Sequence, residues 1–193
     1  MSGIKKRASN PEQKAFRRQQ IISSARCRFE ELSYDDVNLS HVAADVGISK
    51  AALYRYFRNK ETLFLALFVE TLGELIETAE MEVTQNDPAK AIVNTLLANP
   101  IYCKLSAILH TVLERSLTLE EATEFKVALL SLVGRHAQMI TANSTLTSQQ
   151  AVSLLLQVQQ ALIGCWHMSH PVGAVAEAIE SGGLQVFKQE FGD

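Results

Sequence analysis

Apolar residues recur at intervals of three and four positions along almost the whole chain, and no strand-length run alternates apolar with polar residues. The first spacing places apolar side chains on one face of an α-helix, whereas alternation would indicate a half-buried strand. Ile22, Ala25, Phe29 and Leu32 follow this pattern and predict a first helix from about residue 11 to 32. We therefore expect an all-α protein with about nine helices.

Capping residues indicate where the N-terminal helices begin. Asn10, with a proline behind it and a glutamine three positions on, fits a capping box at the start of the first helix. Asn38 predicts a second helix over about 39–46, and Gly47 predicts a turn with positive φ. Ser49 then begins a third short helix that we expect to end near residue 57.

Similar signals continue through the rest of the chain. Asn59 begins a long fourth helix, Asp87 precedes a proline, and Thr118 and Thr147 each open a capping box. The last helix is expected over about 172–191, where a glycine pair either allows close backbone approach or breaks the helix. The chain after the fourth helix should therefore contain about five helices.

Residues 38–57 have the anatomy of a helix-turn-helix: NLSHVAADVGISKAALYRYF. If Leu53 and Phe57 face inward, one helical turn apart, then Lys50, Tyr54 and Arg55 face away from that core. Hydroxyl groups and cations bond phosphate oxygens, so this outward face suits a nucleic acid. Two roles fit Tyr56: packing under a neighbouring loop, or a place on the same outward face.

Charge divides the chain unevenly. Residues 1–60 contain twelve Lys or Arg and six Asp or Glu, a net charge of +6, whereas residues 61–193 contain six and fifteen, a net charge of −9. Only the first part suits a polyanion. We expect two domains, 1–60 and 61–193, that meet on the fourth helix near residue 60.

Residues 11–68 resemble the DNA-binding domain of the TetR (tetracycline-repressor) family of bacterial transcriptional regulators. The similarity is concentrated in the segment VGISKAALYRYFRNKETLF. The residues that carry it are Ala43, Gly47, Ser49, Leu53, Tyr54, Tyr56, Phe57, Lys60 and Leu63. Ser33 departs from the family pattern, because many members have glycine there in a left-handed turn. The rest of the chain resembles the family only in length and in its helical character.

The resemblance implies a sequence-specific regulator, most often a repressor, whose homodimer binds a near-palindromic double-stranded operator. It implies that Asn38, Tyr54 and Lys60 hold phosphates and that residues 49–55 form the recognition helix. A cation at Lys60 opposes the helix dipole unless a phosphate accompanies it. The expected DNA-binding residues are Asn38, Ser40, His41, Ser49, Lys50, Ala51, Ala52, Tyr54, Arg55, Tyr56 and Lys60.

The resemblance also implies that the second domain dimerises and binds a small-molecule effector, here of unknown identity. Residues 149–166 are apolar on more than one face, which indicates that a second subunit covers one of them. Polar or soft residues that interrupt apolar helices are candidates for the effector pocket, and each could instead be a packing residue. These candidates are Tyr102, Cys103, His110, Met139, Trp166 and His167.

Other functions fit the sequence less well. Cys165 and His167 diverge by about 200° around a helix, so CWHMSH does not indicate a metal site. HExxH, GxSxG and CxxC motifs are absent from the sequence, and we expect neither an enzyme nor a cofactor. The main alternative is a helix-turn-helix protein whose second domain only dimerises or docks a protein partner. A large, closed, mostly apolar cavity in that domain would favour the sensor, and a filled core would favour the alternative.

The three cysteines, Cys27, Cys103 and Cys165, are odd in number and far apart, which favours reduced thiols. The first twenty residues lack the apolar segment of a signal peptide, and no apolar run approaches the roughly 20 residues of a membrane span. We expect a cytoplasmic protein without a membrane partner.

Overall fold

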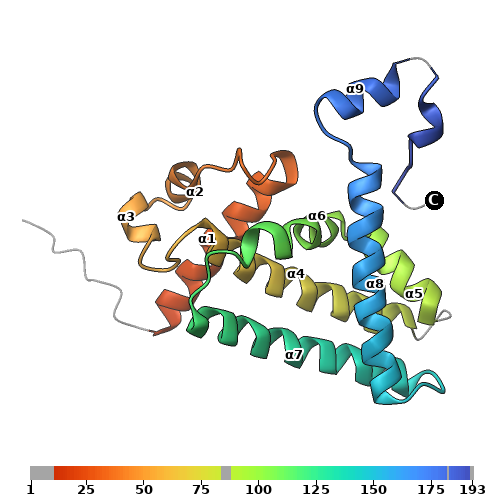
Figure 1. Ribbon diagram of the computed structural model, residues 1–193. Coiled ribbons are helices and arrows are strands. Elements are labelled where there is room, and N and C mark those ends of the chain that lie inside the picture. The colour runs from red at the N-terminus through yellow and green to blue at the C-terminus, as the bar shows by residue number, and fades with distance from the viewer. Residues whose placement is uncertain (1–10, 84–87, 182, 192–193) are drawn as a thin grey trace, which may run out of the picture. The chain divides into compact units, whose positions relative to one another are not determined.

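The computed structural model describes residues 11–83, 88–181 and 183–191, and in these ranges it contains helices and no strand (Figure 1). The nine α-helices of the described residues are α1 (Pro11–Glu31), α2 (Leu39–Asp45), α3 (Lys50–Leu53), α4 (Lys60–Val83), α5 (Pro88–Leu97), α6 (Pro100–Ile108), α7 (Leu119–Ala142), α8 (Ser148–Ser169) and α9 (Ala174–Glu180). A π-helical turn, Leu109–Leu113, follows α6, and a 3₁₀ turn, Gln185–Phe187, follows α9. The predicted all-α class is confirmed.

The chain divides into two compact units, residues 1–67 and 68–193, and the division falls inside α4. The boundary expected near residue 60 lies at the start of α4, seven residues before this division. Both units therefore take part of their core from the same long helix.

An aromatic cluster lies at the centre of the first unit. Phe64 of α4 makes edge-to-face contacts with Phe29 and Tyr34, at ring-centroid distances of 5.1 and 4.9 Å. Ile21 and Phe29 of α1 are buried, but Leu32 is 36% exposed. The prediction that Leu32 belongs to the apolar stripe of the first helix is wrong. α1 ends at Glu31, so Leu32 lies beyond the helix.

Side-chain caps begin the short helices as predicted. The Asn38 Oδ1 accepts from Ser40 N at 2.8 Å, and the Ser49 Oγ accepts from Ala52 N at 3.1 Å. Asn59 Oδ1 accepts from Thr62 N at 2.9 Å at the start of α4. Each cap satisfies a backbone N–H that has no partner inside its helix.

The predicted starts of the later helices are confirmed in part. Thr118 and Thr147 form the predicted capping boxes at α7 and α8. The proposed caps Asn10 and Asp87 lie outside the described residues.

The third helix is shorter than predicted. α3 ends at Leu53, and residues 54–56 form a turn instead of a continuation to Phe57. Tyr56 N donates to Leu53 O at 2.8 Å, an i to i−3 bond that tightens the chain at the end of the helix. Phe57 is nevertheless buried, as predicted.

Two turns in the first unit use different chemistry. Gly47 has φ +67°, the left-handed conformation predicted for it. At the position where many family members have glycine, Ser33 keeps a negative φ, since every described residue with positive φ is a glycine. The Ser33 Oγ donates to Asp36 Oδ2 at 2.6 Å and accepts from Asp36 N at 3.3 Å, which closes the turn with a side chain.

A glycine-to-alanine pair tests the turn. Gly47→Ala is expected to lower the free energy of unfolding by about 1 kcal/mol, because a Cβ disfavours positive φ. Gly134→Ala, inside α7 with no atom within 4 Å of the new Cβ, should raise it by about 0.5–1 kcal/mol. Urea unfolding of both variants measures the two changes. A stabilising Gly47→Ala would contradict the left-handed turn.

In the second unit, α8 packs against α6 and α7, and α5 packs against α6. The α4 residue Phe68 contacts Tyr102 and Phe125, at ring-centroid distances of 5.4 and 6.1 Å. No single described helix is long and apolar enough to cross a bilayer; residues 89–97 and 100–113 meet that test only together, and a bend of 87° separates them.

The last helix is much shorter than the predicted 172–191. α9 ends at Glu180, Ser181 is extended, and Gly183 has φ +91°. The helix has therefore ended before the glycine pair, and the left-handed φ of Gly183 fits a break and not a continuing helix. Gly182 lies outside the described residues.

Candidate functional site

The turn between α2 and α3 holds the two short helices together. Ile48 N donates to Ala43 O at 2.9 Å, and Gly47 N donates to Ala44 O at 3.0 Å. Val42, Ala43 and Leu53 are buried beneath it. These contacts leave the remaining sides of α2 and α3 toward solvent.

Side chains of α1 fix the end of α2. Arg28 donates from Nε and Nη2 to the two carboxylate oxygens of Asp45, both at 2.7 Å, and Ser24 Oγ donates to the same carboxylate at 2.7 Å. Hydrogen bonds from Arg28 and Ser24 lower the pKa of Asp45 to about 2. Arg17 Nη1 donates to Val46 O at 2.8 Å. Two of the basic residues behind the positive charge of residues 1–60 therefore stabilise the helix-turn-helix itself.

The predicted DNA-binding residues lie at or near the surface, and none of the eleven is buried. Tyr54 is 44% exposed, and Lys50 and Arg55 are exposed beside it. Among the described residues, neither Lys50 nor Arg55 has an ion-pair partner. This solvent-facing group of Lys50, Tyr54 and Arg55 can bind phosphate oxygens without breaking an existing contact.

The side chain of Tyr56 lies beside α1. It is half-buried and lines a surface groove with Glu12, Gln13, Phe16 and Arg17 of α1. This position is compatible with both roles that fitted this residue in the sequence.

Lys60 has partners within the first unit. Its ammonium donates to the carbonyl of Tyr34 and, at 3.3 Å, to that of Asp35, and lies 4.3 Å from the centroid of the Tyr34 ring. Burial lowers the pKa of Lys60. Lys60 therefore has a structural role at the N-terminus of α4 besides phosphate binding, because it binds backbone carbonyls of the segment between α1 and α2.

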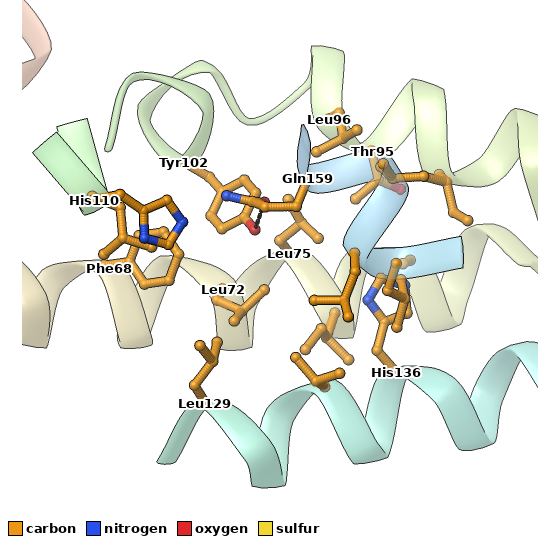
Figure 2. A pocket seen from close by; sticks show the side chains of 18 of the residues that line it. Phe68, Leu72, Leu75, Thr95, Leu96, Tyr102, His110, Leu129, His136 and Gln159 are labelled. Atoms are coloured by element: carbon orange, nitrogen blue, oxygen red, sulfur yellow. Dashed lines mark hydrogen bonds between the residues drawn. The ribbon is translucent and has the colours of Figure 1, made fainter. Parts of the chain in front are cut away.

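A cavity of about 210 Å³ lies in the second unit, and Figure 2 shows the side chains around it. Its lining residues come from α4 to α8 and are mostly apolar. They are Phe68, Leu72, Leu75, Ile76, Ala79, Ile92, Thr95, Leu96, Tyr102, Leu109, His110, Lys126, Leu129, Val133, His136, Leu155, Leu156, Val158 and Gln159. A small number of polar groups in an apolar cavity is typical of a small-molecule site.

The structure brings only two of the six predicted pocket residues into this cavity, Tyr102 and His110. Tyr102 is buried, and its hydroxyl donates to Gln159 Oε1 at 2.8 Å. His110 lies in the π-helical turn, with Nδ1 3.0 Å from Glu114 Oε2.

The other four lie elsewhere in the second unit. Cys103 is buried, its Sγ donates to Leu96 O at 3.4 Å, and burial raises its pKa to about 12. Met139 packs against the core cluster around Ile140. Trp166 stacks on His170 at 3.9 Å between ring centroids. His167 Nε2 lies 3.2 Å from a backbone carbonyl, that of Ala107.

Sequence reasoning missed His136 and Gln159, the polar residues with unpaired atoms in the cavity. His136 is 6% exposed, and its Nε2 has no hydrogen-bond partner, nor does Nε2 of Gln159. Gln159 interrupts an apolar helix, which is the signal used for other candidates. His136 gives no comparable signal, because Arg135 precedes it and Gln138 follows two positions later, so it does not interrupt an apolar run.

His136 predicts a pH effect on stability. Burial lowers the pKa of His136 from 6.5 to about 4, partly offset by the Glu80 carboxylate. Between these values the unfolded chain binds the proton more readily, so stability falls as pH decreases from about 6.5 to 4, by at most about 3 kcal/mol. His136→Gln should remove this part of the pH dependence. Urea unfolding of both proteins at pH 7, 5.5 and 4 gives the dependence of the unfolding free energy on pH. The same dependence in both proteins would refute the prediction.

Two family models match the chain. Residues 64–193 match the model described as tetracyclin repressor-like, C-terminal domain, and residues 21–67 match that of bacterial regulatory proteins, tetR family. Together they cover residues 21–193, which include all of the second unit and most of the first.

Individual relatives are more distant. The fatty acid metabolism regulator protein of Bacillus subtilis is 33% identical over 79 residues, which are 41% of this chain and 41% of that protein. The match thus spans about two fifths of that relative. The transcriptional regulator BetI of Brucella anthropi is 24% identical over 166 residues, 83% of this chain and 84% of the relative.

Among solved structures, the fatty acid degradation regulator FadR from Bacillus halodurans superimposes with a TM-score of 0.57 at 17% identity. The alignment covers 93% of this chain and 99% of the other. At this identity the similarity concerns the fold alone.

Proposed function

This chain belongs to the tetR family of bacterial regulatory proteins, and from that premise we propose that it is a repressor that binds operator DNA as a homodimer and releases it when a small molecule occupies the second unit. The observation that carries the proposal is the solvent-facing group of Lys50, Tyr54 and Arg55 on a helix-turn-helix.

The chemistry of that group fits duplex DNA. Cations and a hydroxyl contact phosphates, and a short helix presents its first residues to base edges in the major groove. Lys50 or Arg55 would read guanine, while Ala51 and Ala52 offer only methyl contacts. Phosphate contacts of this kind position the protein on the duplex. Few side chains are then left to distinguish one base pair from another.

We propose that a second copy of this chain packs against the exposed side of α8. Of its 22 residues only Ala151 and Leu162 are buried, while Leu156 and Met168 are 55% and 57% exposed. Burying such side chains against the same helix of a partner is favourable and gives a two-fold dimer. A stable monomer at micromolar concentration in light scattering would refute this part of the proposal.

The cavity of the second unit supports effector sensing over the alternative of a domain that only dimerises or docks a protein. A ligand shifts DNA affinity only if it binds one geometry of the protein more tightly than the other. We propose that α4, which begins in the first unit and lines the cavity in the second, carries this difference.

Selection from a randomised duplex library tests DNA recognition. The intact protein should enrich an inverted repeat with half-site centres about 10–10.5 bp apart, or a multiple of that spacing, as expected for a two-fold dimer. The double variant Lys50→Ala, Arg55→Ala is the control. Equal enrichment by both proteins, or none by either, would contradict the proposal.

Lys60 is proposed to contact phosphate in addition to its internal contacts. Lys60→Ala should then lower the slope of log affinity against log salt by about one per half-site, because one fewer counterion is displaced. Lys90→Ala, on an exposed part of α5, is the control. An unchanged slope combined with a lower unfolding midpoint would restrict Lys60 to holding the carbonyls of Tyr34 and Asp35.

A further inference from the structure

The volume of the cavity indicates the size of the molecule that fits inside it. Its walls are formed chiefly by aliphatic and aromatic side chains such as Phe68, Leu72, Ile76 and Leu155. An apolar cavity of about 150 Å³ accommodates benzene. By proportion, a cavity of about 210 Å³ accommodates a molecule of about eight non-hydrogen atoms.

One polar group in the wall is oriented and lacks a partner. The Tyr102 hydroxyl donates to Gln159 Oε1 at 2.8 Å, and burial raises the pKa of Tyr102 to about 12, so the phenol keeps its proton. Because the amide oxygen of Gln159 accepts this bond, its nitrogen is turned away from the Tyr102 hydroxyl, and in Figure 2 it points toward the side of His110. Gln159 Nε2 is buried without an acceptor. A buried donor of this kind is stabilised by a ligand that accepts from it.

The ionisable side chains that line the cavity are either paired with an opposite charge or neutral. Lys126 Nζ lies 2.6 Å from Glu114 Oε1, and His110 Nδ1 lies 3.0 Å from Glu114 Oε2. Burial keeps the pKa of His136 near 4, so this side chain is neutral at pH 7. Among the described lining residues no cation is left without a counter-charge, and an anionic group would lose its hydration without compensation.

We infer that the cavity selects an uncharged, mostly apolar molecule of about eight or nine non-hydrogen atoms, whose carbonyl-type acceptor binds Gln159 Nε2. The inference rests on the proposed effector role of this cavity and adds the chemical class of its ligand. Gln159, held by Tyr102, is the residue that determines this specificity.

Three probes of nearly equal size test the inference: acetophenone, ethylbenzene and benzoate. Binding to the intact protein at pH 7, without DNA, is followed by ligand-observed NMR titration. Acetophenone should bind about tenfold more tightly than ethylbenzene, which lacks the acceptor, and more than about tenfold more tightly than benzoate, which carries a charge. Gln159→Leu should bring the affinity of acetophenone to within about twofold of ethylbenzene.

Gln157→Leu is the matched control, because Gln157 is exposed on the same helix and does not line the cavity. It should keep the preference for the ketone. If Gln159→Leu does not fold, Gln159→Met keeps a side chain of similar length without a donor and should also abolish the preference.

Three results would overturn the inference: benzoate binding as tightly as acetophenone, a ketone preference that survives loss of Gln159, or no binding by any probe at millimolar concentration. Failure of the proposed function is a separate result. Acetophenone that binds as expected but leaves operator affinity unchanged would refute the effector coupling and leave the ligand class intact.

Discussion

Phe64→Ala is expected to lower the free energy of unfolding of the first unit by about 3–5 kcal/mol, because it removes a fully buried ring and leaves a cavity that its neighbours cannot fill. The ring is in edge-to-face contact with both Phe29 and Tyr34, so two further aromatic contacts are lost. Loss of this packing should also weaken DNA binding, since the cluster joins α4 to the helix that supports the helix-turn-helix.

Hydrogen exchange followed by mass spectrometry is the suitable measurement, because it reports the two compact units separately. Protection should fall across residues 11–67 and change less in residues 88–181. Phe16→Ala is the matched control, as Phe16 is 66% exposed in the same unit and should alter stability by no more than about 0.5 kcal/mol. Equal effects of the two substitutions would contradict the placement of the core.

Arg55→Ala is expected to weaken operator binding by about 10- to 100-fold per half-site if Arg55 reads a base, and to relax specificity at that position. If Arg55 binds only phosphate, the loss should be similar for all sequences and the salt slope should fall by about one per half-site. The reason for a large effect is that this guanidinium is exposed without an ion-pair partner among the described residues.

Fluorescence anisotropy on the selected operator and on a scrambled duplex, at several salt concentrations, distinguishes the two cases. Arg26→Ala is the control, because Arg26 lies on α1 beside Glu30, outside the helix-turn-helix. It should change affinity by less than about threefold. Equal losses for Arg55→Ala and Arg26→Ala would indicate that only the total charge of the unit matters.

The basic residues of the first unit thus have two different functions. Arg17, Arg28 and Lys60 bind backbone carbonyls or a carboxylate and stabilise the fold. Lys50 and Arg55 face solvent. The net charge of residues 1–60 indicates a polyanion partner, but it counts both groups equally.

Local features of the structure were predicted well from the sequence, because their causes act within a few residues. The period of apolar residues predicts the helices, and Asn38, Ser49, Thr118 and Thr147 cap them through bonds to backbone groups two or three positions away. Gly47 is of the same kind, since its φ depends on its own lack of a Cβ. The errors concern the ends of α3 and α9: α3 ends in a tightened turn, and α9 ends at Glu180, where Ser181 is extended.

The sequence by itself therefore determined the all-helical class, the helix-turn-helix and its outward residues, and through them the family. Only the tertiary structure decided which charges are paired and which side chains meet in the cavity. Arg28 and Asp45 are 17 positions apart, and Tyr102 and Gln159 are 57 apart. Contacts over such separations depend on how whole helices pack, and no period or cap in the sequence specifies that packing.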